Sequence, residues 1–334
     1  MTPDPALDPA PALDPALDPA LDPVPALAPD PAPSLGPVGS LCLGGNLFGW
    51  TADQSASFAV LDAFAEAGGT FLDTADVYSA WVPGHSGGES ERVVGRWMAS
   101  RGNRDRMVVA TKVGSMPGLT GLSAATVRKA VEGSLERLQT DRVDLYYAHR
   151  DDEGTPLEES LGAFDALVRD GKVRRLGASN YTAARLAEAL AVQDREGLAR
   201  YVALQPEYNL LHRDYEAELM PLLAREGLAC LPYASLASGF LTGKYRDGVA
   251  VDSPRAPKVA AYLDDRGRAA LAALDEVAAA HGTPVAAVAL AWLAAQPTVV
   301  APLASARSVE QLRAFLPALE LRLTRDELER LSAV

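Results

Sequence analysis

The sequence predicts a (β/α)8 barrel of the α/β class with extra helices, and three observations lead to this fold. Eight short apolar runs are rich in β-branched or aliphatic residues and lack strict polar alternation, as is typical of buried parallel strands. Longer amphipathic segments separate the runs, and the alternation takes roughly 250 residues, the usual length of such a barrel. The rival fold, an open doubly wound sheet that binds nucleotides, normally carries Gly-x-Gly-x-x-Gly after its first strand, and this chain has no such motif.

An unusual N-terminal segment precedes the barrel. Residues 1–33 repeat a Leu-Asp-Pro-Ala unit, in which proline blocks helix and sheet and the apolar residues are too sparse to form a core. We therefore expect residues 1–37 to be a disordered low-complexity tail and residues 38–334 to form the barrel domain. A linker, a partner-binding segment and a start codon assigned too early remain alternatives for the tail.

The eight expected strands follow in order, and from the second one onward polar residues mark their ends. The runs are SLCLGG (40–45), TFLDTA (70–75), MVVATKV (107–113), VDLYYAH (143–149), VRRLGASN (173–180), YVALQPEY (201–208), LACLPYA (228–234) and TVVAPLA (298–304).

Apolar residues at intervals of three and four predict helices between these strands. Examples are Phe58, Leu61 and Phe64; Val127, Val131, Leu135 and Leu138; and Leu157, Leu161, Phe164 and Val168. The segment TPLE (155–158) predicts a helix start with Thr155 as the cap, and TPVA (283–286) and TRDE (324–327) repeat parts of that signal. Two extra helices are expected near 266–281 and 324–332.

Composition excludes several classes of partner. The net charge of −13 argues against a nucleic acid or an anionic membrane, since both require basic patches. No apolar run approaches the roughly 20 residues that span a bilayer, and the N-terminus does not resemble a secretory signal. Cys42 and Cys230, the only cysteines, lie in apolar runs and indicate buried thiols in a reducing compartment. We expect a soluble cytoplasmic protein that has no identifiable protein partner.

A barrel gathers its chemistry where strands end and loops begin. The second strand ends at Asp73, the third at Lys112 and the fourth at His149. Ser179, Asn180, Gln205, Tyr233, Ser305 and Arg307 follow the later strands. Each residue alone has an ordinary explanation: a turn cap for Asp73, a solvated side chain for Lys112, a rim residue for His149. Tyr78 alone is most simply a surface aromatic, and it is the convergence of these residue types that favours a site.

This set of side chains suits the reduction of a carbonyl group. A phenol of pKa ~10 is a poor proton donor near neutral pH, and a nearby ammonium group would lower its pKa. We expect Asp73 to orient Lys112 and Lys112 to tune Tyr78; a shift to about 7 would take roughly 4 kcal/mol. His149 is expected to bond the carbonyl oxygen, and the amides of Asn180 and Gln205 suit another amide, such as that of nicotinamide.

At these residues the chain resembles the aldo-keto reductases. The similar segments are TFLDTADVYSAW, GGESERVVGRWM, VVATKVG, VDLYYAHRDD, TPLEESL, LGASNY, LQPEYNLL and GFLTGKY, and they extend over about residues 40–334. The pair His149-Arg150 and GFLTGKY resemble the bacterial branch that is related to potassium-channel β subunits. The resemblance implies a (β/α)8 barrel that binds NADP(H) without a Rossmann fold and requires no metal.

The resemblance also implies residue roles. Asp73, Tyr78, Lys112 and His149 would be the catalytic tetrad, with Tyr78 as the general acid. The cofactor-binding residues would be Gly45, Asn46, Asp73, Ser179, Asn180, Gln205, Tyr233, Leu236, Gly239, Lys244, Arg255, Ser305, Arg307 and Gln311. Arg307 favours NADPH, because a guanidinium group suits the extra phosphate. Ala314 and Phe315 replace the Glu-Asn pair that usually contacts adenine, and the segment before residue 42 is short for the family's opening hairpin.

We therefore predict an NADPH-dependent reductase of a small aldehyde or ketone, a sugar-derived compound being one option. The alternative is a nucleotide-sensing barrel that regulates a partner, although the channel subunits usually carry asparagine where this chain has His149. A hydrolase with paired carboxylates is disfavoured by Lys112 beside Asp73. Substrate choice belongs to the loops, in which Trp50 and Trp81 are expected to form pocket walls, with packing as the alternative. Residues 81–87, 150–154 and 245–263 belong to those loops.

Overall fold

The computed structural model describes Leu35, residues 38–246, Val251 and residues 259–334. The predictions for the remainder of the N-terminal tail and for Arg255 therefore lie outside the described residues. The strands are β1 Cys42–Gly44, β2 Phe71–Asp73, β3 Val108–Val113, β4 Ser115–Met116, β5 Leu119–Thr120, β6 Leu145–Ala148, β7 Leu176–Ser179, β8 Tyr201–Gln205, β9 Ala229–Cys230 and β10 Leu303–Ala304. The helices are α1 Gln54–Glu66, α2 Glu89–Arg101, α3 Ala124–Leu138, α4 Leu157–Arg169, α5 Ala183–Glu196, α6 Leu219–Glu226, α8 Asp265–His281, α9 Val285–Ala294, α10 Val309–Arg313 and α11 Arg325–Ser332.

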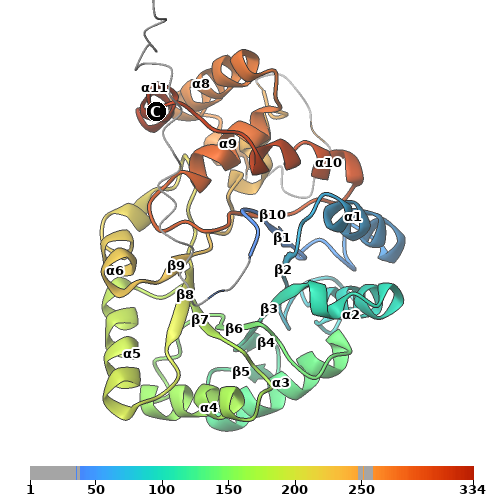
Figure 1. Ribbon diagram of the computed structural model, residues 1–334, viewed down its shortest axis with the longest axis vertical. Coiled ribbons are helices and arrows are strands. Elements are labelled where there is room, and N and C mark those ends of the chain that lie inside the picture. Colours follow the sequence, from blue (N-terminus) through green and yellow to red (C-terminus); the bar gives the residue numbers. More distant parts are fainter. Residues whose placement is uncertain (1–34, 36–37, 247–250, 252–258) are drawn as a thin grey trace, which may run out of the picture.

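Eight parallel strands form one curled sheet, in the order β10-β1-β2-β3-β6-β7-β8-β9. The two ends of this order meet, because Cys230 pairs with Val299 and the Leu303 N–H donates to the Pro232 carbonyl at 2.9 Å. Figure 1 shows the strands around a common centre, with the helices outside them. The predicted (β/α)8 barrel is confirmed, and all eight predicted runs contain a strand.

Local details differ from the prediction for physical reasons. The last run pairs at Val299 and again at Leu303, because Pro302 between them has no N–H to donate to the ladder. The hairpin of β4 and β5 was not predicted, although its Pro117-Gly118 turn, with Gly118 at φ +77°, is typical of a type II turn.

The predicted helix caps are correct in one case and wrong in another. Thr324 and Glu327 form the reciprocal capping box that the TRDE segment predicts. Thr155 is not a cap: α4 begins one residue later, with Pro156 in the cap position. The Thr155 hydroxyl instead donates to the Asp152 carboxylate at 2.6 Å, while the Pro156 carbonyl accepts from the first helix N–H groups, those of Glu159 and Ser160. Both predicted extra helices are present as α8 and α11.

Two hydrophobic clusters hold the barrel together. The larger one lies between the sheet and the helices, and the smaller one fills the barrel and includes Cys42, Phe71 and Leu145, the first residues of their strands. Leu35, only 2 % exposed, joins the smaller cluster. A residue ahead of β1 therefore helps to fill the barrel at the end opposite the polar strand ends.

The described part of the chain contains no single helix that is long and apolar enough to cross a membrane. The pair α8 and α9 passes that test together by length and composition alone, and the two helices meet at a bend of 98°.

Candidate active site

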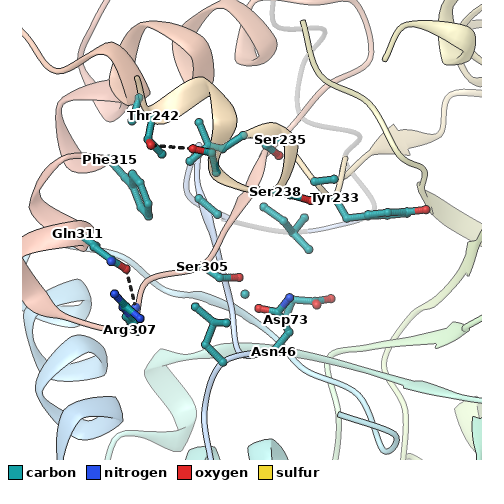
Figure 2. Close-up of a pocket in the computed structure, with 18 of the residues that line it drawn as sticks. Asn46, Asp73, Tyr233, Ser235, Ser238, Thr242, Ser305, Arg307, Gln311 and Phe315 are labelled. Atoms are coloured by element: carbon teal, nitrogen blue, oxygen red, sulfur yellow. Dashed lines mark hydrogen bonds between the residues drawn. The ribbon is translucent and has the colours of Figure 1, made fainter. Parts of the chain in front are cut away.

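A cavity of about 1330 Å³ lies at the carboxyl ends of the strands. Most of the predicted site residues line it, although they come from all parts of the chain: Asn46, Trp50, Asp73, Tyr78, Trp81, His149, Ser179, Asn180, Gln205, Tyr233, Leu236, Gly239, Lys244, Ser305, Arg307 and Gln311. Figure 2 shows Asp73 and Tyr233 toward one side of this cavity and Arg307, Gln311 and Phe315 toward the other. The barrel therefore brings together the strand ends that the sequence singled out.

Lys112 connects three groups beneath the cavity. Its ammonium group donates to Asp73 Oδ2 at 2.5 Å, to the Thr74 carbonyl at 2.9 Å and to the Tyr78 hydroxyl at 2.9 Å. A lysine has three N–H donors, so each of them has an acceptor. The side chain is 1 % exposed, and β3 places it directly beside β2, where Asp73 ends the strand. This geometry fixes the position of Tyr78 relative to a charge.

Both carboxylate oxygens of Asp73 have hydrogen-bond partners. Oδ1 accepts a hydrogen bond from Gln205 Nε2 at 2.8 Å, while Oδ2 accepts from Lys112 and lies 3.3 Å from the Tyr78 hydroxyl. A buried carboxylate is stable only with such partners. The pair Asp73 and Lys112 is thus an anchored unit, and the phenol is attached to it by the shorter bond from lysine.

The pKa of Tyr78 differs from the value expected from the sequence. Burial raises it to about 12, and this effect outweighs the opposing influence of the Lys112 charge. The expected shift to about 7 is therefore not present in the free protein. The reason is that burial disfavours the phenolate, and a sequence does not reveal how deeply a side chain is buried. A protonated phenol is, however, the form that donates a proton.

His149 lies across from Tyr78, with the two ring centroids 6.3 Å apart. Burial lowers the pKa of its imidazole to about 3, with further lowering by the charges of Lys112 and Arg150. Nδ1 is buried and has no hydrogen-bond partner within the described residues. A neutral ring with a free polar atom can bond a ligand without adding charge to the site.

The predicted amide-binding residues form a connected network. Asn180 Nδ2 donates to the His149 carbonyl at 2.9 Å, and the Tyr233 hydroxyl donates to Asn180 Oδ1 at 2.8 Å. The Ser179 hydroxyl donates to the Gln205 carbonyl at 2.8 Å. Asn180 has a positive φ of +58°, a conformation that asparagine tolerates better than most residues. The network holds four adjacent strand ends in one arrangement around the cavity.

The loop after β9 has an unusual backbone. Ala234, Ala237, Ser238 and Gly239 all have positive φ, and the first three are non-glycine residues in a conformation that costs roughly 1 kcal/mol each. Strain of this kind persists where the surroundings impose it and often accompanies ligand binding. Successive residues of this kind can turn several N–H groups toward an anion. Lys244 lines the same part of the cavity.

Two cations and an unsatisfied acceptor favour a phosphorylated nucleotide in this cavity. The guanidinium of Arg307 is exposed, while its backbone N–H donates to Gln311 Oε1 at 3.1 Å (Figure 2). Asn46 Oδ1 is buried without a partner among the described atoms, so a hydroxyl group could donate to it. The donor set thus fits a dinucleotide with its phosphates near Lys244 and Arg307.

Gly45 lies beside the cavity, not in its lining. Its N–H donates to the Asp73 carbonyl at 2.7 Å, and a Cβ atom at this position would lie 2.6 Å from the Ser90 hydroxyl. The absence of a side chain is therefore what lets the residue pack against the end of β2. This contact positions Asp73.

Sequence reasoning missed several lining residues. The lining also includes Gly44, Leu47, Thr51, Glu207, Ser235, Ser238, Thr242, Tyr262, Pro284, Ala286, Leu303, Ala304, Ser308 and Glu310. Glu207, Ser235 and Ser238 follow strand ends, so the rule that found Gln205 and Tyr233 could have found them. Pro284 and Ala286 belong to the start of α9, and no local signal pointed to them.

Trp50 and Trp81 both line the cavity. Their rings meet edge to face at 5.6 Å, and Trp81 also lies 6.3 Å from the Tyr78 ring. Trp81 is 51 % exposed. In the described chain, no group of three or more His, Cys, Asp or Glu side chains is placed to hold a metal ion.

Comparison with known proteins gives consistent matches over nearly the whole chain. The sequence profile of the Aldo/keto reductase family matches residues 40–334. The uncharacterized oxidoreductase YrpG of Bacillus subtilis is 36% identical over 88% of this chain and 91% of its own length. The norsolorinic acid reductase stcV of Emericella nidulans is 35% identical, over 86% of this chain and 76% of its own. An aryl-alcohol dehydrogenase of Pestalotiopsis microspora is 33% identical over 86% of this chain and 77% of its own length.

Proposed function

This chain is an oxidoreductase of the aldo/keto reductase family, and we propose that it uses NADPH to reduce an aldehyde or ketone to the alcohol. The observation that carries the proposal is the contact of Lys112 with both Asp73 and Tyr78 at the base of the cavity. The family generally uses NAD(P)H. The preference for NADPH is inferred from Arg307, and the cytoplasm is proposed from the two buried free thiols.

In this mechanism Tyr78 is the proton donor. Its hydroxyl would give its proton to the carbonyl oxygen, and the Lys112 ammonium would stabilise the phenolate that results. Asp73 keeps Lys112 charged and oriented. His149, held neutral, would donate an N–H to the same oxygen and align the carbonyl with Tyr78. NADPH, when bound, supplies the hydride for the carbonyl carbon.

Residues along the cavity would hold the cofactor. Ser179, Asn180 and Gln205 would bind the carboxamide, with Tyr233 against the nicotinamide ring. Asn46 would accept from a ribose hydroxyl. Leu236, Gly239 and Lys244 would line the pyrophosphate, and Ser305, Arg307 and Gln311 the 2′-phosphate side. Gly45 acts through the position of Asp73, and Arg255 remains a proposal from the sequence alone.

The substrate class can be narrowed by analogy. The names of two relatives connect them to an aryl alcohol and to norsolorinic acid, and the two tryptophans of this cavity offer aromatic surface against which a ring can pack. A small aromatic carbonyl compound is therefore the first substrate to test, beside sugar-derived aldehydes.

A turnover assay tests the proposed function. Purified protein is mixed with NADPH or NADH and a panel of aromatic, aliphatic and sugar-derived aldehydes and ketones, and nicotinamide absorbance is followed. Consumption of NADPH with formation of the alcohol supports a reductase. Tight binding of NADPH without turnover of any carbonyl would instead support the nucleotide-sensing alternative.

Replacing Arg307 by alanine is expected to raise the Kd for NADPH about tenfold or more and to leave the Kd for NADH unchanged. The reason is that charge-assisted bonds to phosphate contribute roughly 1.5–3 kcal/mol, and NADH has no 2′-phosphate. Fluorescence titration with both cofactors measures the effect. Arg313→Ala, which removes another exposed arginine of the same segment, is the control. Equal losses for NADPH and NADH would contradict the assignment.

The rate of reduction is expected to stay constant between pH 6 and pH 9. Tyr78, with a pKa of about 12, keeps its proton throughout this range, and His149, with a pKa of about 3, stays neutral. The measurement is kcat at saturating NADPH and carbonyl substrate and constant ionic strength. A fall in kcat centred near pH 6.5 would show that a histidine of ordinary pKa titrates in the reaction.

A further inference from the structure

Arg150 occupies a fixed position beside His149. The His149 N–H donates to the Val113 carbonyl at 2.9 Å, and the His149 carbonyl accepts from Asn180 Nδ2 at 2.9 Å. The backbone that carries Arg150 is therefore held on both sides by neighbouring strand ends. The Arg150 side chain is exposed and lines the catalytic cavity.

The two aspartates that follow Arg150 have other partners. Both Asp151 oxygens accept from Arg185 Nε at 3.0 Å. Asp152 accepts from the Leu122 N–H at 2.7 Å and from the Thr155 hydroxyl at 2.6 Å. Arg150 itself makes no ion pair or hydrogen bond within the described residues. Its charge nevertheless acts inside the cavity, since it adds to the lowering of the His149 pKa that burial causes.

Of the cations in the described lining, Arg150 is the one beside His149, at the end of the cavity where we place the substrate carbonyl. Lys244 and Arg307 lie toward the proposed phosphate positions, and the charge of Asp73 is balanced by Lys112. Besides Asp73, the described lining contains the carboxylates of Glu207 and Glu310, and the Glu207 and Arg150 charges both act on Tyr233, the first raising its pKa and the second lowering it. Glu207 and Arg150 form no ion pair, so Arg150 remains available to an anion.

The contact of Trp50 with Trp81 indicates a second feature of the substrate, an aromatic ring. Trp50 and Trp81 meet edge to face, and Trp81 adjoins Tyr78, the proposed proton donor. An aromatic ring that bears a carbonyl group could pack against these two tryptophans and direct its carbonyl toward Tyr78. A guanidinium group binds a carboxylate through two parallel hydrogen bonds, which fixes orientation as well as distance.

We infer that Arg150 is a substrate-binding residue, and that the substrates are aldehydes or ketones whose aromatic ring also carries a carboxylate or a similar acidic group. The inference rests on the proposed function, because it requires the carbonyl to lie at Tyr78. It goes beyond that function because it names Arg150 as the residue that selects acidic substrates.

The test compares three aldehydes that differ in charge: 4-carboxybenzaldehyde, its neutral methyl ester, and the cationic 4-(trimethylammonio)benzaldehyde. With the wild-type protein and NADPH, we expect the acid to have a KM about tenfold or more below that of the ester, with similar kcat. Arg150→Gln should raise the KM for the acid to that of the ester and leave the kinetics of the ester unchanged. Arg150→Lys should restore part of the preference, because it keeps the charge without the second hydrogen bond.

Arg128→Gln is the matched control, since Arg128 is an exposed arginine on α3 that does not line the cavity. It should leave all three aldehydes unaffected. Inhibition by 4-(hydroxymethyl)benzoate gives a second readout, and Arg150→Gln should weaken it about tenfold. Equal KM values for acid and ester in the wild type, or a preference for the cation, would overturn the inference while the proposed function stands. Failure to reduce any carbonyl would instead overturn the proposed function.

Discussion

Tyr78→Phe is expected to lower kcat for carbonyl reduction by about 10²- to 10⁴-fold, which is the usual contribution of a positioned general acid. Phenylalanine keeps the ring that contacts Trp81 and removes only the hydroxyl. Lys112 loses one of its three acceptors and keeps Asp73 and the Thr74 carbonyl. The site should therefore stay folded and lose its proton donor.

Two measurements separate this loss from a general defect. The Kd for NADPH, from fluorescence titration, should change by less than about threefold, because the hydroxyl is proposed to meet the substrate and not the cofactor. Tyr146→Phe is the control: Tyr146 is buried, does not line the cavity, and its hydroxyl has no hydrogen-bond partner in the described structure. If Tyr78→Phe keeps kcat within tenfold of the wild type, Tyr78 is not the acid.

The fold was predictable because its main signals are local. Short apolar runs and helical spacing depend only on neighbouring residues, and they located all eight strands. The errors arose where one residue changed a hydrogen-bond pattern. Pro302 interrupts the pairing of the last run, and Asp152 attracts the Thr155 hydroxyl that was expected to cap α4. The partner that a hydroxyl or a strand residue takes depends on the exact path of the backbone, which apolar spacing does not specify.

The candidate site was predictable to the extent that it follows the strand-end rule. Asp73, Gln205 and Tyr233 sit at or just after strand ends, and parallel strands in a barrel end on the same face. Tyr78 lies in a loop five residues beyond β2, where the strand-end rule does not apply. Its hydrogen bond from Lys112 shows that the loop returns to the strand ends.

Electrostatic properties were the least predictable part. The sequence indicated that a lysine near Tyr78 would lower the pKa of the phenol, and the pKa is instead raised because burial has the larger effect. Burial depends on every element packed around the side chain, and the charge depends on one neighbour. The sequence thus indicated which side chains the barrel brings together, while the balance of their interactions required coordinates.

Lys112→Met is expected to abolish measurable reduction and to lower the free energy of unfolding by about 3–5 kcal/mol. Removing one member of a buried ion pair leaves the other charge without compensation, and Asp73 is only 2 % exposed. Methionine has a similar length, so the change removes charge and hydrogen bonds with little change in volume. Urea denaturation followed by circular dichroism measures the stability.

The loss of activity in Lys112→Met has two possible origins: lower stability, and loss of the charge that stabilises the Tyr78 phenolate. Adding Asp73→Asn separates them. In Asp73→Asn/Lys112→Met the uncompensated carboxylate is gone, so most of the lost stability should return. Activity should not return, because neither residue of the pair then stabilises the Tyr78 phenolate. If the double variant regains both stability and turnover, the buried pair holds the barrel together and takes no part in proton transfer. Recovered stability without turnover would place the pair of Asp73 and Lys112 in the reaction itself.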